Sequence, residues 1–199
     1  MSSHPTGSRP FPVVMVLAPG LMLAGVALMP APGTWNLSHL LFLAGTLLMA
    51  PAGLVLWRLL DGGGPPWLRH SGLLLVLLGV PALAGQLLID LVVLQLAGGD
   101  RTGMGPLFRA IQASPTFDLL LYSSGPALLF VGLALSGAAL LLRGGAPRLP
   151  GWALITGTLV MGAARVTDQH LAEIAGLAVI LVALAAVAAP TRVRDRQLA

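Results

Sequence analysis

The sequence contains no cysteine, and only 9% of its 199 residues are charged. The absence of cysteine excludes disulfides, thiolate catalysis, iron–sulfur ligation and cysteine-type zinc sites. Soluble domains carry roughly a quarter charged residues, so a chain this poor in charge is typical of a membrane protein. Aromatic residues make up only 5% of the chain, which argues against a core filled by large rings.

Apolar and small residues take the place of the missing charge. The apolar set makes up 56% of the chain, with 25 glycines and 16 prolines, and the mean hydropathy is +0.90. Small residues allow transmembrane helices to approach one another closely. All eleven basic residues are arginine, and the net charge of +4 is scattered along the chain. This distribution favours a role in membrane orientation over a nucleic-acid surface.

Six apolar runs are long enough to cross a bilayer, because a helix needs about 20 mainly apolar residues to span the hydrocarbon layer. The runs are continuous instead of alternating, which argues against barrel strands, and glycine- and proline-rich segments separate them. We therefore expect an all-α polytopic membrane protein, a bundle of six transmembrane helices. The predicted spans are 11–29, 37–60, 72–96, 119–142, 149–166 and 171–189.

The placement of the arginines predicts that both termini are cytoplasmic, because the cytoplasmic flanks of spans collect positive charge. With the N-terminus inside, the inner flanks hold Arg9, Arg58, Arg69, Arg143, Arg148, Arg192, Arg194 and Arg196, and the outer flanks hold Arg101, Arg109 and Arg165. We expect a protein of the plasma (inner) membrane with a transmembrane domain at 11–189. Cytoplasmic tails are expected at 1–10 and 190–199, and an extracytoplasmic loop at 98–116.

The first predicted span and the outer loop each carry a further sequence signal. The first predicted span resembles a secretory signal, because Arg9 precedes it and small residues follow it. Its apolar run is longer than a signal core, and Pro30 and Pro32 would hinder cleavage, so we expect the span to be retained. Within the long outer loop, residues 104–113 place apolar and polar side chains on opposite helical faces, which predicts a short interfacial helix.

Ionisable side chains inside spans are costly and therefore mark candidate functional positions. Asp90 lies near the outer end of the third predicted span, and Gln86 shares its helix face one turn earlier. The topology brings polar side chains from the other spans to the same depth. We expect an outer-leaflet polar cluster of His39, Gln86, Asp90, Ser124, Arg165, Asp168, His170 and Glu173.

Several interpretations of this cluster stay open. In the first, the cluster is a structural network in which Arg165 pairs with Asp90, or with Asp168 and Glu173. In the second, its two histidines and two of its carboxylates bind a divalent metal ion or haem, although no spacing signature indicates such a site. In the third, a buried carboxylate couples transport to a proton or another ion.

A fourth interpretation is catalytic and depends on the sequence Tyr-Ser-Ser-Gly at 122–125, together with Ser-His-Leu-Leu-Phe at 38–42 and His-Leu-Ala-Glu-Ile-Ala-Gly at 170–176. These patterns resemble rhomboid intramembrane serine proteases, whose six spans place a Gly-x-Ser-Gly serine on the fourth helix and a histidine on the sixth. The resemblance implies that Ser124 is a nucleophile activated by a base. Tyr122 and Glu173 depart from the family pattern, since they stand in place of its first glycine and its histidine.

Among these alternatives, the sequence favours a non-enzymatic membrane component or accessory subunit with a polar cluster in the outer leaflet. A small proton- or ion-coupled transporter is the alternative, followed by a rhomboid-like hydrolase. We assign no catalytic residue, metal or cofactor. The expected partners are the lipid bilayer and a membrane protein or second copy of the chain, and no nucleic acid.

Overall fold

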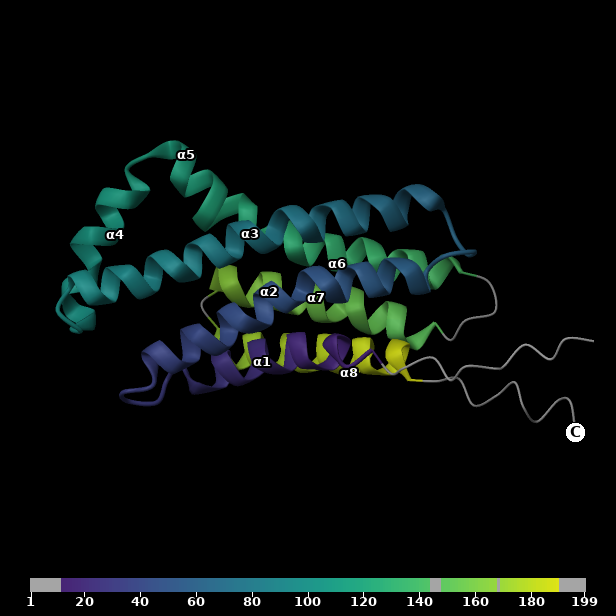
Figure 1. Ribbon diagram of the computed structural model, residues 1–199, viewed down its shortest axis with the longest axis horizontal. Coiled ribbons are helices and arrows are strands. Elements are labelled where there is room, and N and C mark those ends of the chain that lie inside the picture. The colour runs from purple at the N-terminus through teal and green to yellow at the C-terminus, as the bar shows by residue number, and fades with distance from the viewer. Residues whose placement is uncertain (1–11, 144–147, 168, 190–199) are drawn as a thin grey trace, which may run out of the picture.

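The computed structural model describes residues 12–143, 148–167 and 169–189, and this part of the chain is helical without strands (Figure 1). The all-α class is therefore confirmed. The six long helices are α1 (Val14–Leu28), α2 (Trp35–Leu59), α3 (Pro66–Leu96), α6 (Ser124–Leu142), α7 (Leu149–Thr167) and α8 (His170–Ala188). Between α3 and α6 lie the short elements η1 (Arg101–Gly103), α4 (Met104–Gln112), α5 (Pro115–Phe117) and the π-helical turn η2 (Asp118–Ser123).

Four helical segments are long and apolar enough to cross a membrane. They are α2, α3, the segment Pro115–Leu142 that ends in α6, and α8. These segments coincide with the second, third, fourth and sixth predicted spans. The first predicted span contains α1, a shorter apolar helix, and the fifth overlaps α7; neither is among the four, so the predicted count of six spans is not confirmed.

The six long helices form a closed ring. Each one packs against the next long helix along the chain, and α8 packs against α1 to complete the ring (Figure 1). Neighbouring helices run in opposite directions, so α1 begins and α8 ends at the same end of the bundle. We call this the Gly62 end, because the loop through Gly62 joins α2 to α3 there, and we call the opposite end the α4 end.

The interior of the ring is filled by apolar side chains from all six long helices. Each long helix contributes at least one fully buried residue, among them Met15, Phe42, Leu83, Leu129, Leu154 and Leu177. The buried hydroxyls of Thr46, Ser136 and Thr158 donate to carbonyl oxygens four residues earlier in their own helices, at 2.8, 3.0 and 2.9 Å. Their polar groups are thus satisfied locally and do not link helices across the interior.

Glycines permit the close packing of the ring, as the composition predicts. A Cβ atom on Gly25 of α1 would lie 2.6 Å from the carbonyl oxygen of Ser38 in α2. A Cβ on Gly45 of α2 would lie 2.6 Å from the carbonyl oxygen of Ala18 in α1. Because both obstacles are backbone atoms, a larger residue at either position would push α1 and α2 apart.

The connection between α3 and α6 forms a cap at the α4 end. After α3, Gly98 and Gly99 turn the chain with φ values of +68° and +83°, which glycine adopts without strain. Helix α4 then runs across the bundle axis (Figure 1). Its buried Met104 packs with Val93 and Leu94 of α3, and the partly buried Leu107, Phe108 and Ile111 join this contact. This helix coincides with the short one predicted at 104–113.

Candidate functional site

His39 lies in the first turns of α2, where its position is set by the start of the helix. The Thr34 hydroxyl before α2 donates to the carbonyl oxygen of Leu28 at 2.6 Å and fixes the turn from α1. His39 is only 3% exposed, and its Nδ1 atom lies 2.9 Å from the carbonyl oxygen of Trp35. Since a carbonyl oxygen only accepts, Nδ1 carries the hydrogen and Nε2 is left for a partner on another helix.

That partner is Asp90 on α3. Its Oδ2 atom lies 3.8 Å from Nε2 of His39, and its side chain is 13% exposed. The Tyr122 hydroxyl of η2 donates to Asp90 Oδ1 at 3.4 Å. The carboxylate therefore joins three elements. Because Nδ1 of His39 already donates to a carbonyl, attraction between Nε2 and the carboxylate requires one proton, carried by the ring nitrogen or by the carboxyl group.

The π-helical turn η2 presents Tyr122 to Asp90, and its sequence explains the turn. Pro126 has no N–H group, and its ring would clash with the carbonyl four residues earlier, that of Tyr122, in a regular α-helix. A Cβ atom on Gly125 would lie only 1.6 Å from the carbonyl oxygen of Leu120, so this turn requires glycine. Isolated π turns inside helices are frequent at functional sites.

The cluster extends from Asp90 to the surface through stacked side chains. The Trp35 ring packs against the His39 ring with 4.0 Å between centroids, and the Arg101 guanidinium lies 4.3 Å from the Trp35 centroid. At the other end of this row of side chains, the Tyr122 ring packs edge-on against the Phe108 ring of α4. We call Arg101, Trp35, His39, Asp90 and Tyr122 the His39–Asp90 cluster.

Asp100 holds Arg101 in place above Trp35. Its carboxylate accepts from the Thr102 backbone N–H at 2.9 Å and from the Thr102 hydroxyl at 2.6 Å. These hydrogen bonds, first that of the hydroxyl and then that of the backbone, lower the pKa of the Asp100 carboxyl. Asp100 thereby caps η1, the short turn that carries Arg101.

A second polar group lies where α7 meets α8. The Nε atom of Arg165 lies 3.0 Å from Oε1 of Glu173, and Nδ1 of His170 lies 3.8 Å from Oε2 of the same carboxylate. Arg165 is 41% exposed and Glu173 12% exposed. The sequence suggested that Arg165 could pair with Asp90 instead, and that pairing is not formed. Asp90 lies on α3, which packs between α2 and α6, whereas α7 and α8 are adjacent and bring Arg165 directly to Glu173.

The predicted cluster is thus divided. His39 pairs with Asp90, and Glu173 pairs with Arg165 and His170, while Asp168 lies outside the described residues. Gln86 is half-buried on α3 and forms no side-chain hydrogen bond with any described residue. Within the part of the chain that the structure describes, no three histidine or carboxylate side chains come together as a metal site.

Ser124 bonds to backbone and not to His39 or His170 among the described residues. It is exposed, and its hydroxyl donates to the carbonyl oxygen of Leu119 at 3.3 Å. Among the described residues, neither His39 nor His170 is hydrogen-bonded to it. In the part of the chain that the structure describes, Ser124 is therefore hydrogen-bonded to a backbone carbonyl and to no basic side chain.

Three members of the His39–Asp90 cluster were not predicted from the sequence. Trp35 could have been found, since it lies one helical turn before His39. Tyr122 and Arg101 depend on the π turn and on η1, for which the sequence gives only the Gly-Pro pair at 125–126 and the Gly-Gly pair at 98–99 as signals.

No protein-family model matches the sequence, and comparison with curated proteins and with solved structures finds no match.

Proposed function

We propose that the chain is a six-span protein of the plasma membrane, with both termini in the cytoplasm, that acts as a non-enzymatic component or accessory subunit of a membrane assembly. In this arrangement α1, α2, α3, the α5–α6 segment, α7 and α8 cross the bilayer in turn. The α4 end, with the His39–Asp90 cluster, then faces outward. The lipid bilayer is one partner, and a different membrane protein or a second copy of the chain is the other.

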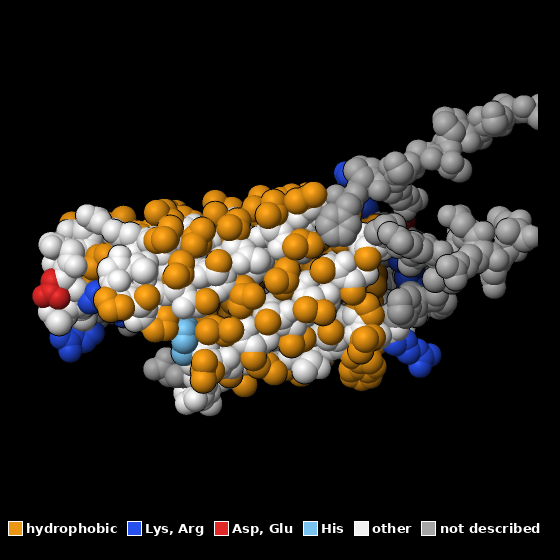
Figure 2. All heavy atoms as spheres, turned by 90° about the horizontal axis from the view of Figure 1, so that it is seen from below, with side chains coloured by type: hydrophobic (Ala, Val, Ile, Leu, Met, Phe, Trp, Pro, Cys, Tyr) orange, Lys and Arg blue, Asp and Glu red, His pale blue; other side chains and the backbone are white. Residues whose placement is uncertain are grey.

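The distribution of side chains on the surface supports the membrane position. Figure 2 shows hydrophobic side chains over one side of the bundle and arginines gathered near its two ends. Among the described residues, Arg58, Arg69, Arg143 and Arg148 lie at the Gly62 end, and Arg101, Arg109 and Arg165 at the α4 end. An excess of arginine at the cytoplasmic side is the usual rule, so the Gly62 end is assigned to the cytoplasm.

The filled interior of the ring carries the non-enzymatic proposal. A transporter needs a polar site near the midplane that reaches both sides, and an enzyme needs a pocket with a nucleophile or base. Here the buried hydroxyls bond within their own helices, and the described ion pairs lie toward the two ends of the bundle. This arrangement supports a protein that acts through contacts with other molecules.

The test is the size of the assembly in its native lipid. The full-length chain, extracted directly from membranes into polymer-bounded nanodiscs, should elute with a mass larger than one copy and with a fixed ratio of components by quantitative mass spectrometry. A second copy alone would identify a homo-oligomer. Particles that contain one copy of this chain and no stoichiometric partner would overturn the proposal.

A second candidate function is ion-coupled transport, because His39 and Asp90 form a largely buried ionisable pair between two apolar helices. Proteoliposomes loaded with a pH-sensitive dye distinguish the two candidates. The proposal predicts that wild-type protein, Asp90→Asn and empty liposomes give the same proton flux under an imposed gradient. A wild-type flux that Asp90→Asn abolishes and Glu173→Gln preserves would favour the transporter.

A further inference from the structure

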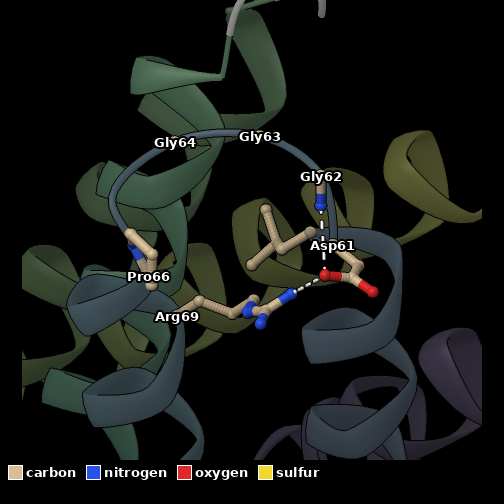
Figure 3. A pocket seen from close by; sticks show the side chains of 7 residues that line it. Asp61, Gly62, Gly63, Gly64, Pro66 and Arg69 are labelled. Atoms are coloured by element: carbon tan, nitrogen blue, oxygen red, sulfur yellow. Dashed lines mark hydrogen bonds and ion pairs between the residues drawn. The ribbon is translucent and has the colours of Figure 1, made fainter.

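A hollow of about 330 Å³ opens at the Gly62 end, beside the loop that joins α2 to α3. It is lined by Leu60, Asp61, Gly62, Gly63, Gly64, Pro66 and Arg69 (Figure 3). The loop arches over the hollow, and the Arg69 side chain extends beneath it toward Asp61. A space of this size lies at the lower end of the range for small-molecule sites.

Arg69 supplies the positive charge of the hollow, and one of its N–H donors is unused. Its guanidinium donates to the Asp61 carboxylate and lies 5.0 Å from the centroid of the Trp57 ring. Its Nε atom is buried and finds no acceptor among the described residues. Asp61, by contrast, is 77% exposed, so its ion pair with Arg69 is weak and a bound anion can compete with it.

Backbone N–H groups around the hollow likewise have unused donor capacity. Within the described ranges, the N–H groups of Gly63, Gly64, Trp67 and Leu68 have no acceptor, and no side chain caps the start of α3. Gly62 and Gly64 have φ values of +76° and +74°. Loops of this kind and the first turn of a long helix both favour anions, because their N–H dipoles converge.

Arg143 adds a second guanidinium beside the same loop. A Cβ atom on Gly63 would lie 2.4 Å from Cγ of Arg143, so the arginine side chain lies directly against the loop. Its guanidinium donates to the carbonyl oxygen of Leu59. Arg58 and Arg148 are exposed at this end of the bundle, and Asp61 is the acid that lines the hollow.

We propose that this hollow binds the phosphate group of an anionic phospholipid. The chemistry is that of guanidinium and backbone N–H groups toward a phosphate monoanion. The choice of a lipid over free phosphate follows from the proposed function, because in a membrane the Gly62 end lies at the level of the head groups. The exposed rings of Trp67 and Trp152, 63% and 57% accessible, lie near the same end, where interfacial tryptophans are expected.

Native mass spectrometry of the detergent-solubilised full-length chain tests the proposal with palmitoyl-oleoyl-phosphatidylglycerol as the probe. One lipid should bind per chain, in preference to the zwitterionic phosphatidylethanolamine. Arg69→Gln and Arg143→Gln should each weaken binding about tenfold, since each removes a charge-assisted contact. Arg109→Gln, at the opposite end, is the matched control and should leave binding unchanged.

Asp61→Asn gives a prediction of the opposite sign. Because Asp61 competes with the ligand for Arg69, this variant should bind the lipid more tightly, whereas a purely structural ion pair predicts weaker binding or none. Melting temperatures and elution profiles of all variants show whether they remain folded, and Arg143→Gln tests the site independently if Arg69→Gln fails to fold.

A competition arm distinguishes the source of the phosphate. The acyl chains of the lipid contribute to its binding, so inorganic phosphate alone should compete poorly. If phosphate at about 10 mM does not displace the lipid, the ligand is the phospholipid as proposed. Displacement by phosphate, or equal binding by wild type and both arginine variants, would overturn it. The measurement is made in detergent, so failure of the proposed orientation or subunit role would not alter its result.

Discussion

The imidazole of His39 and the carboxylate of Asp90 meet at 3.8 Å between α2 and α3, while Arg165 forms its ion pair with Glu173. His39 and Asp90 should therefore be coupled energetically. We expect Asp90→Asn and His39→Ala each to lower the free energy of unfolding in detergent by about 1 to 3 kcal/mol. The double variant should lose less than the sum by at least about 0.5 kcal/mol.

The control for this cycle pairs Asp90→Asn with Arg165→Gln. Because Arg165 contacts Glu173 and not Asp90, the coupling between these two variants should be smaller than the coupling between Asp90→Asn and His39→Ala. Strong coupling between Asp90 and Arg165, with none between Asp90 and His39, would mean that the helices are arranged differently.

Gly125 should tolerate no side chain. In the π turn, a Cβ atom would lie 1.6 Å from the carbonyl oxygen of Leu120, and the obstacle is backbone. We expect Gly125→Ala to destabilise the protein by about 3 kcal/mol or more, measured by thermal unfolding in detergent. Gly162→Ala in α7 is the matched control, because nothing lies within 4 Å of the added atom, and it should be neutral or up to about 1 kcal/mol more stable. Equal effects would contradict the π turn.

Ser124→Ala should leave the fold and any cellular phenotype nearly unchanged. The Ser124 hydroxyl is exposed and donates to a backbone carbonyl, so its loss should cost about 1 kcal/mol or less. A fluorophosphonate probe should not label the wild-type protein. Stoichiometric labelling that disappears in Ser124→Ala would instead support the rhomboid-like hydrolase.

The ion pair of Asp61 and Arg69 predicts a dependence on pH. The Arg69 guanidinium holds the pKa of the Asp61 carboxyl below its usual value, so the pair stabilises the folded state above the unfolded pKa. That stabilisation is lost as the pH falls through the lower folded pKa. The difference in melting temperature between wild type and Asp61→Asn should stay constant from about pH 5 to 8 and shrink below about pH 4. A difference that grows on acidification would contradict this pairing.

The helical class, and the end of its helix at which each polar residue lies, could be predicted from the sequence, because both follow from the length and position of apolar runs. The approach of His39 to Asp90 is an example, since each lies near the same end of its predicted span. The partner of Arg165 could not be chosen, because the choice depends on which helices are neighbours in the ring. For that reason the alternative with Glu173 is correct and the one with Asp90 is not.

The π turn shows a second limit of the sequence. Gly125 and Pro126 indicate that the helix is interrupted, but the form of the interruption depends on the packing of α6 against α3. Tyr122 therefore reached the cluster through backbone geometry that no local pattern specifies. Arg101 likewise meets Trp35 only because η1 folds back beside the start of α2.

The most direct test of the account is the side of the membrane on which each end of the bundle lies. The protein has no cysteine, so single cysteines at Ala113 and Arg148, both exposed and at opposite ends, can be labelled without background. With an impermeant maleimide on intact cells, Ala113→Cys should be labelled at once and Arg148→Cys only after the cells are permeabilised. Labelling of Arg148→Cys on intact cells, or protection of Ala113→Cys, would contradict the proposed topology.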